Sequence, residues 1–423
     1  MFGRMGRKKM SGERSAGTHI RLPAYGQALL DVLSFENCRF AKLLNLSQSS
    51  LDALVSFCDC NQLTLLLRHL ARPHLPDRIR LRMDRNYQDF SLRFIRLQAA
   101  VLEIARSFEN AEIDLVLLKG FGQVPEFAPD PMVRAQGDVD IWCLPAQIDH
   151  AHQALRELGY RSVGESESRH LAPMIREKTW TWTGDYFAPD LPIPIDLHYR
   201  LWDEDMEGIR GPRESDFWQR RSSLPIGGQN ISVLDEADTL AFAAVHLLMH
   251  LLHGDLRLNR AWEIGYFLNS RSEDELFWTR WQNMFPEHLR QLQVLIFALV
   301  QQWFACRVPD IVDCEIRTLA PDLKLWIRHF GWSPVEALFA PNKDELWLHM
   351  ALLTRRGDRR RVLFRRLFPA HAKVANMARS SGRPGAELTF LWRRTLHHAR
   401  TLVSSGAHGV KWWRLKRATR QFA

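Results

Sequence analysis

The sequence predicts an α+β fold, with a small mixed-sheet core flanked by an N-terminal and a C-terminal helical region. Apolar residues recur every three or four positions up to about residue 86, and short apolar runs separated by Gly and Pro follow. Helical periodicity returns after about residue 205. We therefore expect three parts: 1–86, 87–205 and 206–423, the last with a basic tail.

The composition is that of an ordinary globular protein, with 423 residues, 46% hydrophobic and 25% charged. The basic stretch 1–15 lacks the apolar segment of a signal peptide. The longest nearly apolar run, 240–252, is shorter than the roughly 18 residues that span a bilayer. We expect a cytoplasmic protein without a transmembrane segment. Of the six cysteines only Cys58 and Cys60 are close in sequence, which favours free or structural thiols over a zinc site.

The elements follow from periodicity and from Gly and Pro breakers. We expect strands at 113–118, 139–144, 179–183 and 193–201. We expect helices at 90–108, 146–158, 235–253, 292–304, 346–354 and 388–403, and linkers at 380–385 and 404–409. Asp235 is the expected N-cap of its helix, Asp238 a capping-box analogue, and Gly254 the stop.

The strand at 139–144 begins beside two aspartates one residue apart, Asp138 and Asp140. Side chains alternate along a strand, so both carboxylates project to one side with Cα atoms about 6.6 Å apart. Val139 and Ile141 then face the core. Two carboxylates this close repel each other and resist burial, so a cation should offset them.

The strand at 193–201 adds a third carboxylate. Asp196 and His198 share one of its faces with Arg200. Three aspartates from neighbouring strands can hold two Mg²⁺ ions, which clamp the attacking and leaving oxygens of phosphoryl or nucleotidyl transfer. We therefore predict Asp138, Asp140 and Asp196 as metal ligands and catalytic residues. His198 either contacts the substrate or orients Asp196.

The turn Lys119-Gly120 follows the first expected strand. A glycine there lets the backbone approach triphosphate oxygens, and the lysine can neutralise them. Arg134, just before the aspartate pair, is a second phosphate candidate. These residues predict an NTP as donor.

The order Leu-Lys-Gly at 118–120, a Pro-rich segment, Arg134, Gly-Asp-Val-Asp-Ile at 137–141 and Ile-Asp-Leu-His-Tyr-Arg at 195–200 resembles a known family. It is the uncharacterised bacterial nucleotidyltransferase family of the DNA polymerase beta-like superfamily, and the resemblance spans about residues 90–270. It implies a mixed sheet with two helices, Asp138 and Asp140 as metal ligands, and Asp196 as the third carboxylate. The chain has Lys119-Gly120 where the superfamily's familiar turn is Gly-Ser, and Tyr199 where Trp is common. Members are often encoded beside polysaccharide or peptide-tailoring genes.

The expected activity is Mg²⁺-dependent transfer of an NMP from an NTP, such as ATP, to an acceptor hydroxyl or phosphate, with release of pyrophosphate. The acceptor is an unidentified small molecule, glycan or peptide, and nucleic acid is possible but not favoured. One alternative is an inactive scaffold that kept the fold and uses its basic C-terminal half to hold an acidic partner. The other is a kinase that transfers the γ-phosphate.

Two further features allow more than one interpretation. His246, His250 and His253 share one helical face without an HExxH pattern, so core or cleft-lining roles are favoured over a metal site or a substrate contact. The tail at 409–422 interleaves aromatic and basic residues. Trp412 and Trp413 either dock on the protein's own helices, which we favour, or contact nucleic acid or a membrane surface.

Overall fold

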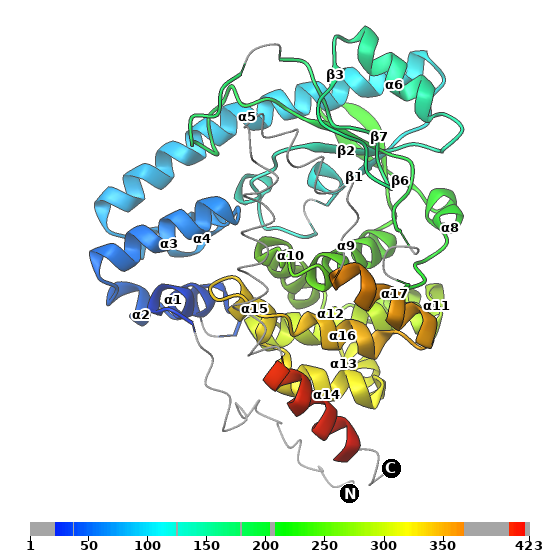
Figure 1. Cartoon of the computed structure of the whole chain (residues 1–423). Coiled ribbons are helices and arrows are strands. Elements are labelled where there is room, and N and C mark those ends of the chain that lie inside the picture. Colours follow the sequence, from blue (N-terminus) through cyan, green and yellow to red (C-terminus); the bar gives the residue numbers. More distant parts are fainter. Residues whose placement is uncertain are drawn as a thin grey trace, which may run out of the picture.

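The computed structural model describes residues 22–36, 38–123, 126–177, 180–203, 208–367 and 406–418. It confirms the predicted α+β class: one seven-stranded mixed sheet is flanked by helices (Figure 1). None of the described helices has the length and apolar character needed to cross a membrane. The expected helix at 388–403 and linker at 380–385 lie outside the described residues. Residues 406–418 form a helix, so the linker expected at 404–409 is wrong over its described part.

The sheet has the order β3-β4-β5-β2-β1-β7-β6. At its centre β2 pairs antiparallel with β1 and parallel with β5, while β7 pairs parallel with β1. The strands are β1 (Val116–Leu118), β2 (Val139–Trp142), β3 (Arg161–Ser162), β4 (Met174–Ile175), β5 (Ile195–His198), β6 (Ser222–Ile226) and β7 (Gln229–Val233).

Strand alternation assigns the two faces of this sheet to two hydrophobic cores. Val139 and Ile141 of β2 pack in a cluster with α5 and α6, as the sequence predicts. Trp142 packs on the other side, in a larger cluster with the helical region. The face that carries Asp140 is therefore turned toward the helical region.

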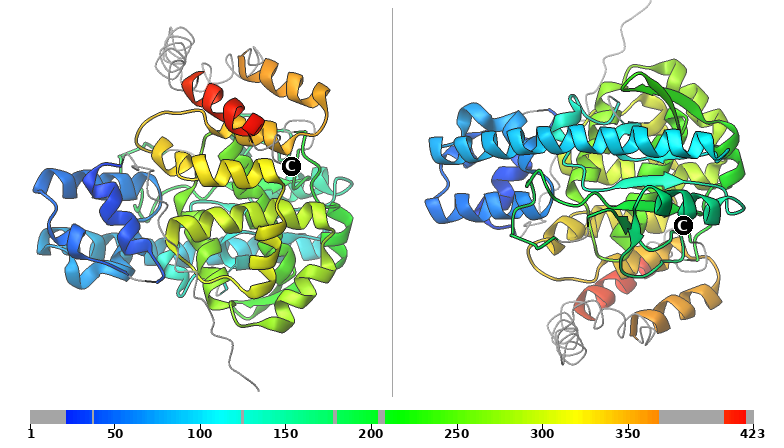
Figure 2. Two further views of the ribbon diagram at one scale, coloured as in Figure 1. Left: turned by 90° about the horizontal axis from the view of Figure 1, so that it is seen from below. Right: turned by 90° about the horizontal axis from the view of Figure 1, so that it is seen from above.

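Helix α5 (Asp77–Asn110) is the longest described element and runs along one side of the sheet (Figures 1 and 2). The boundary expected at residue 86 lies inside it. The other helices before the sheet's last strands are α1 (Ala24–Leu33), α2 (Ala41–Leu44), α3 (Gln48–Cys60), α4 (Thr64–Ala71), α6 (Ile148–Glu157) and α8 (Glu214–Gln219). Those after them are α9 (Glu236–Leu252), α10 (Leu258–Ser270), α11 (Glu275–Met284), α12 (Glu287–Phe304), α13 (Asp310–Thr318), α14 (Pro321–Phe330), α15 (Ser333–Ala337), α16 (Glu345–Leu352) and α17 (Arg356–Leu367).

Two strand predictions need correction. The strands β6 and β7 lie in the part expected to be helical, where Gly227 and Gly228 form a hairpin turn with positive φ angles of 54° and 84°. Residues 180–183 form no strand, and residues 178–179 lie outside the described part. A β-prone composition is insufficient where the chain finds no strand to pair with.

The N-terminal helices share one hydrophobic cluster with the helices that follow the sheet. Hydrogen bonds to backbone carbonyls join the two regions: Phe35 N donates to Phe304 O at 2.8 Å, and the indole Nε1 of Trp262 donates to Leu33 O at 3.1 Å. In the tail, Trp412 is 5% exposed and packs near Phe330, whereas Trp413 is 56% exposed. The docking expected of both is confirmed for Trp412 and wrong for Trp413.

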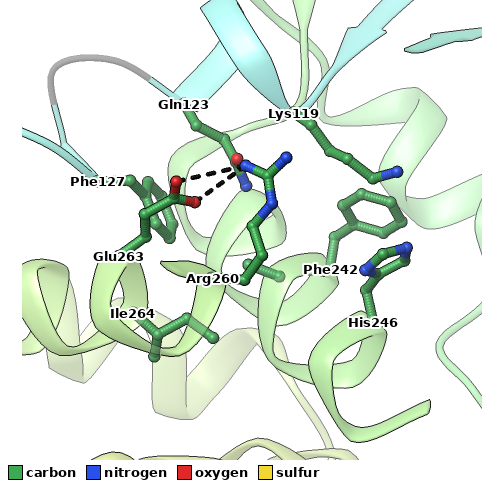
Figure 3. Close-up of a pocket in the computed structure, with 9 residues that line it drawn as sticks. Lys119, Gln123, Phe127, Phe242, His246, Arg260, Glu263 and Ile264 are labelled. Atoms are coloured by element: carbon green, nitrogen blue, oxygen red, sulfur yellow. Dashed lines mark hydrogen bonds and ion pairs between the residues drawn. The ribbon is translucent and has the colours of Figure 1, made fainter. Parts of the chain in front are cut away.

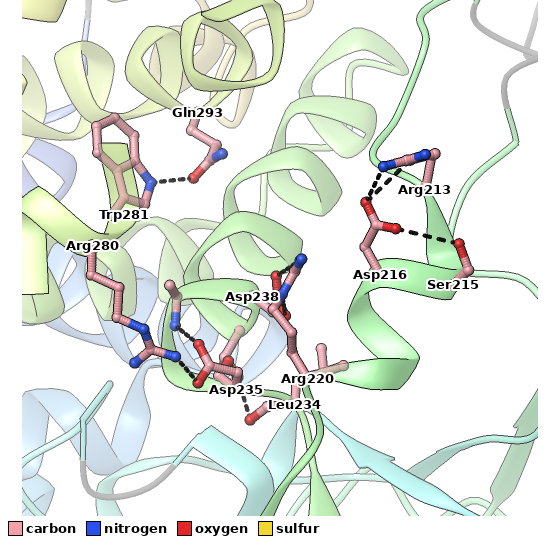
Figure 4. A network of polar contacts seen from close by, with 12 residues as sticks. Arg213, Ser215, Asp216, Arg220, Leu234, Asp235, Asp238, Arg280, Trp281 and Gln293 are labelled. Carbon is pink, nitrogen blue, oxygen red and sulfur yellow. Dashed lines mark hydrogen bonds and ion pairs between the residues drawn. The ribbon is translucent and has the colours of Figure 1, made fainter. Parts of the chain in front are cut away.

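Polar contacts fix the start of α9 (Figure 4). Asp235 caps the helix as predicted, accepting from Ala237 N at 3.0 Å, and also pairs with Arg280. Asp238 is no capping-box residue. Its buried carboxylate accepts two hydrogen bonds from Arg220, at 2.8 and 2.6 Å. This ion pair joins α9 to the segment leading into β6.

Candidate active site

Parallel pairing of β2 and β5 brings two of the predicted carboxylates side by side. Asp140 lies in register with Asp196, and Trp142 with His198. Ligand atoms of Asp140, Asp196 and His198 all lie within 4.8 Å of one another, the one such group found among the described residues. Asp138, which precedes the first residue of β2, is not part of it.

Asp140 is the most heavily contacted of the three carboxylates. Its Oδ1 accepts from Lys119 Nζ at 2.8 Å and from His198 Nε2 at 2.9 Å. Burial alone would raise the pKa of Asp140, but Lys119 and His198 outweigh it and hold this pKa below its usual range. Asp140 is therefore ionised, and Lys119 is the cation that the sequence required.

Asp196 lacks such compensation. Its Oδ1 is buried and has no hydrogen-bond partner in the described chain. Burial, followed by the charges of Asp140 and Asp138, raises the pKa of Asp196 to about 7. Burial and Asp140 likewise raise the pKa of Asp138 to about 6. The site thus holds more negative charge than Lys119 offsets.

His198 orients a different aspartate from the one expected. The sequence suggested a hydrogen bond to Asp196, whereas Nε2 meets Asp140. Burial is the main cause that lowers the pKa of His198, so its neutral ring donates Nε2–H to the carboxylate. The ring centroid of His170 lies 5.1 Å from that of His198. The hydrogen bond from His198 Nε2 fixes the direction in which the Asp140 carboxylate points.

The Lys119-Gly120 turn has an unusual backbone. Both residues have positive φ, 49° and 45°, a conformation that costs about 1 kcal/mol for a residue with a Cβ. A Cβ on Gly120 would lie 2.2 Å from the side chain of Gln136. Gln136 Nε2 in turn donates to Asp138 O at 2.8 Å. The left-handed backbone therefore favours glycine at position 120, and the end of the Gln136 side chain occupies the space that a Cβ would take.

Arg134 supports the turn from inside the protein. Nη1 donates to Gly120 O at 2.6 Å, Nε to Glu263 Oε1 at 2.8 Å, and Nη2 to Gln123 Oε1. The side chain is only 3% exposed. All three nitrogens serve protein acceptors, so this geometry favours a structural role over the phosphate contact expected from the sequence.

Comparison with known proteins identifies the family of this chain. The sequence profile of a family described as uncharacterised nucleotidyltransferase matches residues 48–305. The chain belongs to this family. The resemblance inferred from the sequence motifs is thereby confirmed. A crystal structure of an antigenic nucleotidyltransferase-like protein from Paracoccidioides brasiliensis aligns with 50% of this chain and 94% of its own, at 13% identity and a TM-score of 0.30. No curated protein matches the chain.

In this member of the nucleotidyltransferase family, a recess lies next to Asp140, because Lys119 lines the recess and also contacts that carboxylate. Figure 3 shows the side chains that line it. It is lined by Lys119, Gln123, Phe127, Phe242, Ala243, His246, Arg260, Glu263 and Ile264. His246 is thus a cleft-lining residue, and His250 pairs with Asp255 at 3.2 Å. The histidine face forms no metal-binding group among the described residues.

Sequence reasoning missed Arg260 and Glu263, both on α10. A charged pair three residues apart inside the apolar stretch "NRAWEIGYF" is a signal that could have found them, because a buried carboxylate needs a partner. Glu263 meets that need twice, accepting from Arg134 and from Arg260 Nη1, the latter at 3.1 Å.

The residues present fit a divalent cation. A buried carboxylate oxygen without a donor on Asp196 and an ionised carboxylate on Asp140 offer the oxygen ligands that Mg²⁺ prefers. Asp138 adds a third negative charge close enough to raise the pKa of Asp196. A bound cation would relieve the repulsion among all three.

Proposed function

We propose that the protein is a Mg²⁺-dependent nucleotidyltransferase that moves an NMP from an NTP onto an acceptor hydroxyl or phosphate and releases pyrophosphate. The observation that carries this proposal is the pairing of Asp140 with Asp196 on adjacent strands, with one Asp196 oxygen buried and without a donor. Membership in a nucleotidyltransferase family supports it.

Asp140 and Asp196 would hold the metal, with Asp138 as the third carboxylate of a two-ion site. Two bound Mg²⁺ ions would neutralise the phosphates and stabilise the charge that develops on the attacking and leaving oxygens. Within the chain, His198 directs the Asp140 carboxylate and Lys119 supplies a fixed positive charge at the same place. The carboxylates are thus positioned before any ligand arrives.

In the transfer step the acceptor oxygen forms a bond to the α-phosphorus while the bond from that phosphorus to the bridging oxygen breaks. Pyrophosphate leaves with the electron pair. Asp196 has a buried oxygen without a donor, so we assign it the acceptor's proton in addition to its ligand role. Lys119 and Gly120 would lie against the triphosphate. We further propose that the reaction takes place in the cytoplasm.

We assign acceptor binding to the helical regions that precede and follow the sheet in the sequence. They share one hydrophobic cluster, which includes Trp142 on the sheet face that carries Asp140, so they lie on the same side as the carboxylates. A small molecule, a glycan or a peptide remains our expected acceptor.

The test is a thermal-shift titration with ATP, GTP, CTP and UTP, each with and without Mg²⁺, beside an Asp140→Asn/Asp196→Asn double variant. We expect a Mg²⁺-dependent rise in melting temperature with at least one NTP, which the double variant loses. Equal shifts in both proteins would refute the metal assignment. Absence of any shift in the wild type would favour a scaffold that lost turnover.

A labelling experiment separates transfer of the nucleotide from transfer of the terminal phosphate. NTP labelled at the α- or the γ-phosphate is incubated with cell extract as a source of acceptor. Nucleotidyl transfer leaves the α label on the acceptor, whereas a kinase leaves the γ label.

A further inference from the structure

The recess beside the carboxylates is lined by side chains from both the sheet region and the helical region. Lys119 comes from the turn after β1, His246 from α9 and Arg260 from α10, and all three point into it (Figure 3). Lys119 belongs to both sites, because it lines the recess while its Nζ contacts Asp140. A ligand in the recess would therefore lie next to the proposed metal site.

Positive charge predominates in this recess. Among its nine lining residues the one carboxylate is Glu263, and this carboxylate is shared between the Arg134 and Arg260 guanidiniums. Within the described chain Arg260 makes both of its hydrogen bonds through Nη1, to the two oxygens of Glu263 at 3.4 and 3.1 Å. Its Nε and Nη2 thus remain available to an anion, and a guanidinium suits bidentate contacts with phosphate.

His246 adds a donor without adding charge. Burial, and then the charge of Lys119, hold the pKa of His246 well below its usual value, so the ring is neutral at physiological pH. Its ring packs against Phe242 and His250, with centroid distances of 5.5 and 4.6 Å. A neutral imidazole can donate one N–H to a phosphate oxygen.

We propose that this recess binds the β- and γ-phosphates of the NTP donor, with Arg260 as the main phosphate ligand, Lys119 bridging to the metal-bound part and His246 donating a hydrogen bond. This inference rests on the proposed function, since it places the leaving pyrophosphate beside Asp140 and Asp196. Arg260 and Glu263 then connect the triphosphate to the Lys119-Gly120 turn, because Glu263 also contacts Arg134.

The test is calorimetric titration of the full chain with sodium pyrophosphate, ATP and AMP in Mg²⁺, for the wild type, Arg260→Gln and Arg260→Lys. Arg257→Gln is the matched control, because Arg257 lies three positions earlier and forms an exposed ion pair with Asp255. We expect Arg260→Gln to weaken pyrophosphate and ATP binding by about tenfold or more. Arg260→Lys should lose less, while AMP binding and the Arg257→Gln control should stay unchanged.

Several results would overturn the inference. These are equal pyrophosphate affinity in the wild type and both Arg260 variants, no pyrophosphate binding by the wild type, or pyrophosphate binding that persists at saturating ATP. The last result would assign the recess to a phosphorylated acceptor. A urea melt of Arg260→Gln shows whether it is folded, and if it is not, the comparison rests on Arg260→Lys.

The outcome is distinguishable from failure of the proposed function. Arg260-dependent pyrophosphate binding without any α-label transfer would retain the phosphate site and reject the transferase. Conversely, α-label transfer with an unchanged KM for NTP in Arg260→Gln would retain the transferase and reject Arg260 as a phosphate ligand.

Discussion

Lys119 Nζ lies 2.8 Å from Asp140 Oδ1, on a turn in which Lys119 and Gly120 both have positive φ. In the metal-free protein the Lys119 ammonium offsets the negative charge of Asp140, as a bound divalent cation would. Lys119 and a metal ion therefore compete for the charge of Asp140.

Removal of Lys119 should change metal and phosphate binding in opposite directions. In Lys119→Met we expect Mg²⁺ to bind several-fold more tightly without nucleotide, because the carboxylates lose their neighbouring cation. ATP should bind more weakly, with a much smaller loss for AMP. Calorimetry measures all three, with Lys42→Met, at an exposed ion pair, as control. Equal losses for ATP and AMP would place Lys119 outside the phosphate site.

Asp196→Asn should stabilise the metal-free protein at alkaline pH. The pKa of Asp196 is raised to about 7 in the folded state and is near 3.8 in the unfolded chain, so the folded state binds this proton more tightly. Its contribution to stability therefore falls as pH rises from about 4 through 7. In urea unfolding we expect the variant to exceed the wild type by on the order of 1 kcal/mol or more at pH 8 and to match it near pH 4.

The matched control for that experiment is Asp149→Asn, at an exposed aspartate of α6. It should track the wild type at both pH values. An Asp196→Asn protein that is less stable at pH 8 would show that the carboxylate has a structural partner. Added Mg²⁺ should stabilise the wild type more than the variant.

Gly120→Ala should be costly, since the added Cβ meets Gln136 and the φ of 45° is unfavourable. We expect a loss of about 1–3 kcal/mol in the free energy of unfolding. Gly137→Ala is the natural comparison, because a Cβ there meets nothing within 4 Å and its φ is not positive. Denaturant unfolding checks both. Equal stability of the two variants would mean that the turn adapts without cost.

Arg134→Gln separates structural support from phosphate binding. It removes three buried hydrogen bonds, to Glu263, the carbonyl of Gly120 and Gln123, although Arg260 still pairs with Glu263. We therefore expect about 3 kcal/mol of destabilisation without nucleotide. Arg213→Gln removes an ion pair whose arginine is 82% exposed and should cost little. An unchanged unfolding midpoint with a selective loss of ATP affinity would restore the phosphate role predicted from the sequence.

The sequence predicted the sheet-borne half of the site, because strand alternation is a strong local rule. Asp138 and Asp140 alternate with apolar neighbours, and Ile195 and Leu197 do the same around Asp196, which identified the carboxylate face. The alignment of Asp140 with Asp196 depends on pairing between distant segments. The family resemblance implied that these residues act together, and the strand register shows how they meet.

Contacts between segments that are distant in the sequence could not be predicted in the same way, because they depend on tertiary packing. The sequence suggested that Arg134 is a phosphate ligand. Its observed acceptors could not be recognised in the sequence, because Glu263 is distant along the chain and the acceptor on Gly120 is a backbone carbonyl. Asp238 has the spacing of a capping-box residue, but its carboxylate forms an ion pair with Arg220 instead. The hairpin of β6 and β7 carried a Gly-Gly signal that was outweighed by the helical pattern around it.

Pairing of β1 with β7 has a consequence for synthesis on the ribosome. The turn that carries Lys119 follows β1, and one edge of β1 has no neighbour until Gln229–Val233 has been made. A nascent chain halted after residue 205 would expose that edge, where another chain could add as a strand. The sheet that carries the carboxylates is thus completed late, and a truncated product that ends there should aggregate.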